Sequence, residues 1–230
     1  MVAKAKQYLG NGLYTVAEAA LYCRVSTAMM SRWLFGSKSG HSVIDPQFGT
    51  EVRSVSFLDL VQTIAIREIR LQRDLPLEKF RQAIKFAKDK YNLDYPFARQ
   101  HCTYLYGDLL VIRSSLDREE YVEASGKHQG QRMFSFVEMY LDNLSFGPEG
   151  LANKFRVFTS HQQKPVSVTM DPHTRFGEPL LPSGYAALTI WDAIQVEGGI
   201  EQAASVYGIP KEETQAAYQF VVDYLGKTTA

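Results

Sequence analysis

Cysteine is scarce in this sequence, and the two cysteines are far apart. Only Cys23 and Cys102 occur among 230 residues, and no CxxC pair is present. A disulfide framework needs more cysteines, and the cysteine pairs of structural zinc sites are separated by only about two to four residues. We therefore expect two reduced thiols, no metal site and a cytoplasmic protein.

Long apolar runs are missing as well. No segment approaches the roughly 18 consecutive apolar residues that a membrane-spanning helix requires. The first residues, MVAKAKQYLGNG, contain two lysines but no apolar run behind them. We therefore expect neither a signal peptide nor a membrane partner.

The common catalytic motifs are also absent. The sequence has no GxSxG, GxGxxG or Walker loop, and its five histidines do not follow metal-ligand spacing. Acidic residues surround Arg118, and a solvated turn explains them better than paired catalytic carboxylates do (Asp117, Glu119, Glu120 and Glu123). We therefore expect no enzyme activity and no cofactor.

The charge is balanced overall but unevenly distributed. Residues 1–100 hold 15 Lys and Arg against 9 Asp and Glu, a net charge of +6. Residues 101–230 hold 10 against 16, a net charge of −6. A basic half suits contact with phosphates, and an acidic half suits a different partner.

The segment 14–35 has the pattern of two short, capped helices. Thr15 and Glu18 predict a capping box for the first helix, and Ser26 predicts an N-cap for the second. Apolar residues would share one buried face (Val16, Ala19, Ala20, Val25, Met30 and Trp33). The second helix would then present the candidate DNA-binding residues outward: Thr27, Ala28, Ser31 and Arg32. The alternative is a plain helical hairpin within a core.

The segments that follow predict a wing and a basic helix pair. Residues 41–44 and 51–55 have the pattern of a β-hairpin around a turn at 46–49. Ser56, with Asp59 three residues later, predicts the start of a long helix, and Pro76 the start of the next. Three arginines are candidate phosphate contacts, with a solvated helix face as the alternative (Arg53, Arg67 and Arg70).

The remaining chain favours an α+β fold. The middle region, 93–160, has aromatic and β-branched segments at 103–112, 121–123 and 133–136, which predict a small sheet, and 154–160 predicts a further strand. After a polar linker at 161–164, we expect a strand at 166–170, a loop at 171–184 and three helices. These helices are predicted to begin at Thr189, Ile200 and Pro210, with glycines at 198–199 and 208 as their ends. The predicted parts are a winged helix–turn–helix at 1–92, the β-rich region at 93–160 and a helical module at 165–230.

The stretch Tyr14–Phe35 resembles the start of MerR-type and excisionase-type winged-helix proteins. The resemblance rests on Tyr-Thr-Val-Ala-Glu-Ala-Ala, followed by Val-Ser and a helix. The predicted order of hairpin wing and helix pair extends it to Tyr91. Arg24 departs from the pattern, because the family usually has glycine at this turn. Either Arg24 adopts a left-handed conformation or the turn has another shape.

The C-terminal segment resembles a small antitoxin-associated domain. The resemblance rests on Asp171-Pro172-His173-Thr174-Arg175-Phe176-Gly177-Glu178-Pro179, followed by Gly184 and three helices. Tyr185-Ala186 stands where that family commonly has Thr-Arg. We take Arg175, Phe176 and Tyr185 as candidate partner-binding residues. Arg175 can also reach a carboxylate or cap helix carbonyls.

Together the two parts resemble the larger VapB-type antitoxins. The resemblance implies a type II antitoxin that represses its own operon as a homodimer on operator DNA. It further implies that a PIN-type ribonuclease toxin is the protein partner, neutralised by direct contact. One alternative is a MerR-like, ligand-responsive regulator with an effector pocket at 103–160. Another is an enzyme built on the middle sheet.

Overall fold

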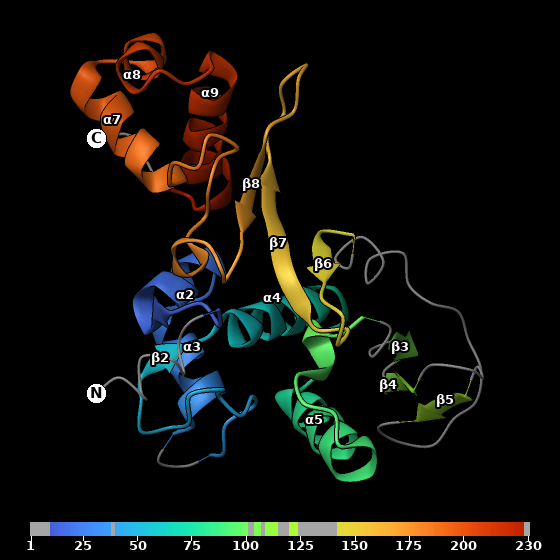
Figure 1. The fold of residues 1–230 in the computed structure, drawn as a ribbon. Helices are drawn as coiled ribbons and strands as arrows, with labels where there is room; N and C mark the ends of the chain where they lie inside the picture. Colours follow the sequence, from blue (N-terminus) through green and yellow to red (C-terminus); the bar gives the residue numbers. More distant parts are fainter. Residues whose placement is uncertain are drawn as a thin grey trace. The chain divides into compact units, whose positions relative to one another are not determined.

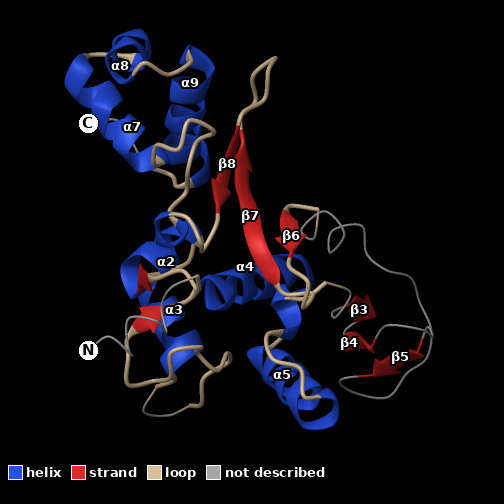
Figure 2. Cartoon of the chain, viewed as in Figure 1, coloured by secondary structure: helices blue, strands red, loops and turns tan. Residues whose placement is uncertain are grey.

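The computed structural model describes residues 10–37, 40–100, 104–106, 109–114, 120–123 and 142–227. The protein is α+β, as its sequence predicts, with its helices and strands drawn in Figures 1 and 2. It divides into two compact units. One spans residues 13–153, and the other contains residues 154–227 together with 10–12.

The first unit opens with the predicted helix pair. Strand β1 (Tyr14–Thr15) leads into α2 (Val16–Tyr22), and α3 (Thr27–Phe35) follows after a short turn. The Thr15 hydroxyl accepts from the Glu18 amide at 3.1 Å, and the Glu18 carboxylate accepts from the Thr15 amide at 2.8 Å. The Ser26 hydroxyl accepts from the Met29 amide at 3.1 Å. Both predicted caps are therefore confirmed.

Four of the six residues predicted to share a buried apolar face are buried in the structure. Ala19, Ala20, Met30 and Trp33 are buried, whereas Val16 and Val25 are half-buried.

The predicted hairpin wing is wrong. Residues 41–44 form no strand, and the amides of Val43 and Ile44 instead both donate to the carbonyl of Trp33, at 2.7 and 3.0 Å. Strand β2 (Ser54–Val55) pairs antiparallel with β1. Val43 and Ile44 are consecutive and both buried. Successive side chains of a hairpin strand point to opposite faces, so a half-solvated wing cannot bury both.

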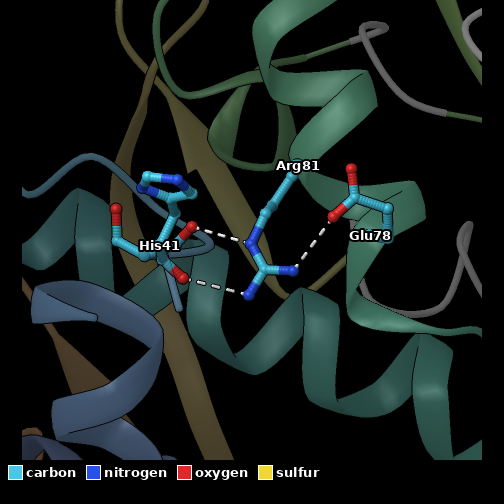
Figure 3. Close-up of polar contacts among 4 residues, drawn as sticks. His41, Glu78 and Arg81 are labelled. Atoms are coloured by element: carbon cyan, nitrogen blue, oxygen red, sulfur yellow. Dashed lines mark hydrogen bonds and ion pairs between the residues drawn. The ribbon is translucent and has the colours of Figure 1, made fainter. Parts of the chain in front are cut away.

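Other elements of the same unit hold the loop between α3 and β2 in place. Helices α4 (Phe57–Arg73) and α5 (Leu77–Tyr91) supply the contacts. From α5, Arg81 Nε donates to the Ser42 carbonyl at 2.9 Å and Arg81 Nη2 to the His41 carbonyl at 3.0 Å, while Glu78 accepts from Nη1 (Figure 3). From α4, both carboxylate oxygens of Asp59 accept from the Gln47 amide at 3.2 Å.

Helix α4 is the core element of this unit. Every residue from Phe57 to Ile66 is buried, so the helix is surrounded along its first ten positions. The predicted capping box is confirmed, with Ser56 and Asp59 each accepting the other's amide at 3.1 Å. Pro76 is the N-cap of α5, and the short helix η1 (Pro96–Ala98) packs against α4.

The middle of the chain contains the expected strands. Strands β3 (Tyr104–Tyr106), β4 (Leu109–Ser114) and β5 (Glu120–Glu123) form an antiparallel sheet in that order. The predicted strand segment at 133–136 lies outside the described residues. A second sheet has the order β6 (Leu144–Phe146), β7 (Ala152–Thr159), β8 (Ser167–Met170), and the boundary between the two units falls within β7.

The predicted linker at 161–164 is the loop of a hairpin. Strands β7 and β8 pair antiparallel, and Ser160 closes their connection. The Ser160 amide donates to the Val166 carbonyl at 2.9 Å, and its hydroxyl accepts from the Val166 amide at 2.9 Å. The segment is therefore part of the sheet's connection and does not separate two domains.

Three helices complete the second unit: α7 (Ala187–Glu197), α8 (Ile200–Tyr207) and α9 (Lys211–Gln219), with a π-helical turn η3 (Phe220–Tyr224) after them. The glycine ends are confirmed, since Gly198 and Gly208 are left-handed C-caps. The predicted start at Thr189 is wrong, because α7 begins at Ala187, whose amide donates to the Pro179 carbonyl at 2.9 Å. A loop carbonyl thus accepts from the first amide of the helix, which has no partner within the helix itself. None of the helices in the described ranges is long and apolar enough to cross a membrane.

The buried carboxyl of Asp59 predicts a pH dependence of stability. Burial raises its pKa to about 6, although hydrogen bonds from Ser56 and Gln47 act in the opposite direction. In the unfolded chain the carboxyl titrates near pH 4, so the native state binds its proton more tightly. The stability that this carboxyl contributes is full below about pH 4 and is lost as the pH rises through about 6.

We expect the free energy of unfolding of the wild type to fall by about 1 kcal/mol relative to Asp59→Asn between about pH 5 and about pH 7.5. Urea denaturation of both proteins at the two pH values measures the change. A difference that stays constant between those pH values shows that Asp59 titrates below this range.

Candidate nucleic-acid interface

Helix α3 presents one polar face to solvent and one apolar face to the core. Thr27, Ala28 and Arg32 are exposed, and Ser31 is half-buried. The opposite side of the helix is buried through Met30, Trp33 and Leu34. The orientation predicted for the second helix is therefore present, with Ala28 and Arg32 one turn apart at the centre of the exposed face.

Arg53 joins this face from another segment. It directly precedes β2, whose pairing with β1 brings the chain back beside the helix pair. Its Nη2 donates to Ser31 Oγ at 2.6 Å, and its guanidinium lies 4.8 Å from the ring centroid of Phe35. Sequence reasoning included Arg53 and Ser31 but missed Phe35, although Phe35 follows Ser31 by four positions on one helix.

Arg67 and Arg70 are placed elsewhere. Arg67 is half-buried and forms an ion pair with Glu68. Its positive charge also lowers the pKa of the buried Cys23 thiol, but burial has the larger effect and raises that pKa. Arg70 donates to the Leu75 carbonyl at 3.1 Å and lies 5.9 Å from the ring centroid of Trp33. Trp33 belongs to the buried side of α3, so Arg70 does not join the exposed face. Arg67 interacts with Glu68 and Cys23, and neither of these residues belongs to that face.

Local carboxylates offset several cations of α5. Lys85 pairs with Asp89 at 2.6 Å, and Lys88 pairs with Asp94 at 2.6 Å. In contrast, neither Arg32 nor Arg53 has an ion-pair partner among the described residues. Uncompensated positive charge is therefore found on the exposed face of α3, which favours binding of an anion there.

The turn before α3 resolves the question raised by Arg24. Arg24 adopts a left-handed conformation with φ 54°. Its amide donates to the Leu21 carbonyl at 3.1 Å, and the Val25 amide donates to the Ala20 carbonyl at 3.0 Å. This pair of bonds is a Schellman motif, which glycine usually completes. The arginine thus keeps the turn geometry that glycine would give.

The candidate partner-binding residues lie on a well-held loop of the second unit. Arg175 and Phe176 have positive φ values of 45° and 56°, and Phe176 is 52% exposed. Arg175 meets the carboxylate of Glu178 at 3.0 Å, so the expected acidic contact is a local one. Two adjacent non-glycine residues in this backbone region are strained, and such strain is concentrated at functional sites.

Tyr185 lies at the far end of the same loop. It is 37% exposed, and its ring meets that of Tyr207 edge-on, with centroids 5.3 Å apart. The loop is held at both sides: Thr169 and Leu180 exchange backbone bonds of 2.8 and 2.9 Å, and the Ser183 amide donates to the buried Glu213 carboxylate at 2.9 Å. Arg175, Phe176 and Tyr185 therefore sit on an ordered frame.

Within the parts of the chain that the structure describes, no group of His, Cys, Asp or Glu side chains is placed to hold a metal ion.

Comparison with solved structures finds a similar fold in a crystal structure. Rv2018 from Mycobacterium tuberculosis has a similar fold, with a TM-score of 0.61 and 19% sequence identity. The likeness covers 89% of this chain and 96% of the other. At this identity it concerns the fold alone. No protein-family model matches the sequence, and no curated protein matches it.

We expect Arg24→Gly to raise the free energy of unfolding by about 1 kcal/mol, because glycine adopts the left-handed conformation without steric cost. Arg24→Ala is the matched control, since it removes the same side chain and keeps the unfavourable conformation. Urea denaturation measures both. Equal stability of the two variants would show that the backbone strain is negligible.

Proposed function

We propose that this protein is a DNA-binding antitoxin: it represses its own operon through α3 and neutralises a PIN-type ribonuclease through its C-terminal unit. The observation that carries the proposal is the exposed face of α3, where Arg32 and Arg53 have no carboxylate partner among the described residues.

The DNA-binding part is supported by the shape and chemistry of that face. A short, capped helix held by the preceding one suits insertion into the major groove. Arg32 can form paired hydrogen bonds to guanine, and the methyl groups of Ala28 and Thr27 can contact thymine. A homodimer would place two such helices on the halves of a palindrome.

The partner-binding part is supported by the loop at 171–185 and by the resemblance to antitoxin-associated domains. Phe176 and Tyr185 are exposed aromatics on an ordered backbone, and such residues commonly anchor protein interfaces. The helices α7 to α9 and η3 are acidic, with Lys211 as the one basic residue between 187 and 224. This composition disfavours DNA as their ligand and favours a protein.

We expect Arg32→Ala to weaken binding to the protein's own promoter fragment roughly ten- to hundredfold and to reduce discrimination between the promoter and unrelated DNA, because a base contact is lost. Fluorescence anisotropy measures both affinities. Lys85→Ala is the matched control, since it removes one positive charge from an exposed side chain of α5. If both variants lose the same affinity, Arg32 contributes to binding only through its positive charge and contacts no base.

We expect Phe176→Ala to weaken the complex with the toxin encoded beside this gene roughly tenfold or more, because an aromatic anchor that the toxin would cover is lost. Tyr185→Ala should weaken it as well. Val196→Ala is the control, since Val196 is an 81% exposed apolar residue on α7. Coexpression gives the functional result, and the wild type should restore growth where Phe176→Ala does not. If the wild type forms no complex and restores no growth, the antitoxin assignment is wrong.

A further inference from the structure

Three side chains on the flank of α3 form an arrangement that we name the arginine latch: Ser31, Phe35 and Arg53. Ser31 and Phe35 are four positions apart on α3, so they occupy the same side of the helix. Arg53 reaches them from the segment before β2, 22 positions away from Ser31. Its guanidinium is bonded to the Ser31 hydroxyl at 2.6 Å and covers the Phe35 ring at 4.8 Å.

The latch leaves most of the guanidinium available. Arginine carries five N–H donors in a planar fork, and Ser31 accepts one of them. Phe35 is half-buried while Arg53 is exposed, so the ring covers one face of the guanidinium and solvent reaches its remaining donors. No carboxylate among the described residues forms an ion pair with Arg53.

The segment that carries Arg53 is held as well. Ser54, the residue after Arg53, pairs with Thr15, which is the N-cap of α2. The loop before it is bonded to α3 through Trp33, to α4 through Asp59 and to α5 through Arg81. Arg53 is thus constrained in both its backbone and its side chain.

We infer that Ser31 and Phe35 are positioning residues that hold Arg53 ready to bind a DNA phosphate beside the groove that α3 enters. This inference rests on the proposed DNA-binding function. A planar fork with one face covered suits the two oxygens of a phosphate. Ser31 and Phe35 follow Ala28 by three and seven positions, so Arg53 lies beside the C-terminal half of the exposed face. A recognition helix contacts bases through its N-terminal residues, so this place suits the backbone of the duplex. In this arrangement Ser31 binds Arg53 and does not contact DNA itself, and Phe35 positions the guanidinium of Arg53.

The expected effect follows from the ordering of one long side chain. Binding costs affinity when a mobile side chain must be immobilised, by an amount equivalent to roughly three- to tenfold. In the wild type this ordering precedes binding. Without Ser31 or Phe35, the Arg53 side chain must be ordered when DNA binds, which lowers the affinity, while the positive charge of Arg53 remains.

The test measures binding to the promoter fragment and to unrelated DNA over a range of salt concentrations, for the full-length chain. Phe35→Leu and Ser31→Ala should each weaken binding roughly three- to tenfold on both DNAs with an unchanged salt slope. Arg53→Ala should weaken both further and lower the salt slope by about 1, because one phosphate contact is lost. Arg53→Lys should keep the slope and lose affinity.

Double variants decide between positioning and general structural support. In the Arg53→Ala background, Phe35→Leu and Ser31→Ala should have no further effect, because the side chain that they position is gone. If the losses add instead, Ser31 and Phe35 act by another route and the inference is wrong. It is also wrong if Arg53→Ala alters the preference between base-pair variants of the promoter. Failure of the wild type to bind any DNA would instead refute the proposed function, and the latch with it.

Discussion

The buried N-terminus of α4 is the point on which the first unit depends. Asp59 completes the capping box with Ser56 and at the same time accepts the amide of Gln47 from the loop between α3 and β2. The Asp59 carboxylate therefore caps the first turn of α4 and also binds the loop that leads to Arg53. Its burial is unfavourable for the charged form, and its hydrogen bonds from the backbone offset part of that cost.

Side-chain contacts decide which of the positive charges in the first hundred residues are paired with carboxylates. The first hundred residues carry a net charge of +6, which favours nucleic acid only in general terms. In the structure, lysines of α5 are paired with nearby aspartates, Arg67 is paired with Glu68, and Arg70 lies over the ring of Trp33 on the buried side of α3. Arg32 and Arg53, at the exposed face of α3, have no such carboxylate partner among the described residues.

Local signals were predictable because their causes are local. The caps at Thr15, Ser26 and Ser56 and the glycine ends of α7 and α8 depend on side chains or backbone freedom within a few residues. The two misplaced features depend on distant partners. In place of the predicted wing there is a loop bonded to Trp33, Asp59 and Arg81, and α7 begins two residues early, where the Pro179 carbonyl accepts from the amide of Ala187.

The sequence by itself determined the α+β class, the helix pair at 14–35 and the outward direction of Thr27, Ala28 and Arg32, since periodicity and capping act over one or two helical turns. The tertiary structure alone decided which arginines stand beside that face. A guanidinium can reach any of several partners, and only the paths of the loop and of β2 place Arg53 on Ser31 and Phe35 while α4 turns Arg70 toward Trp33.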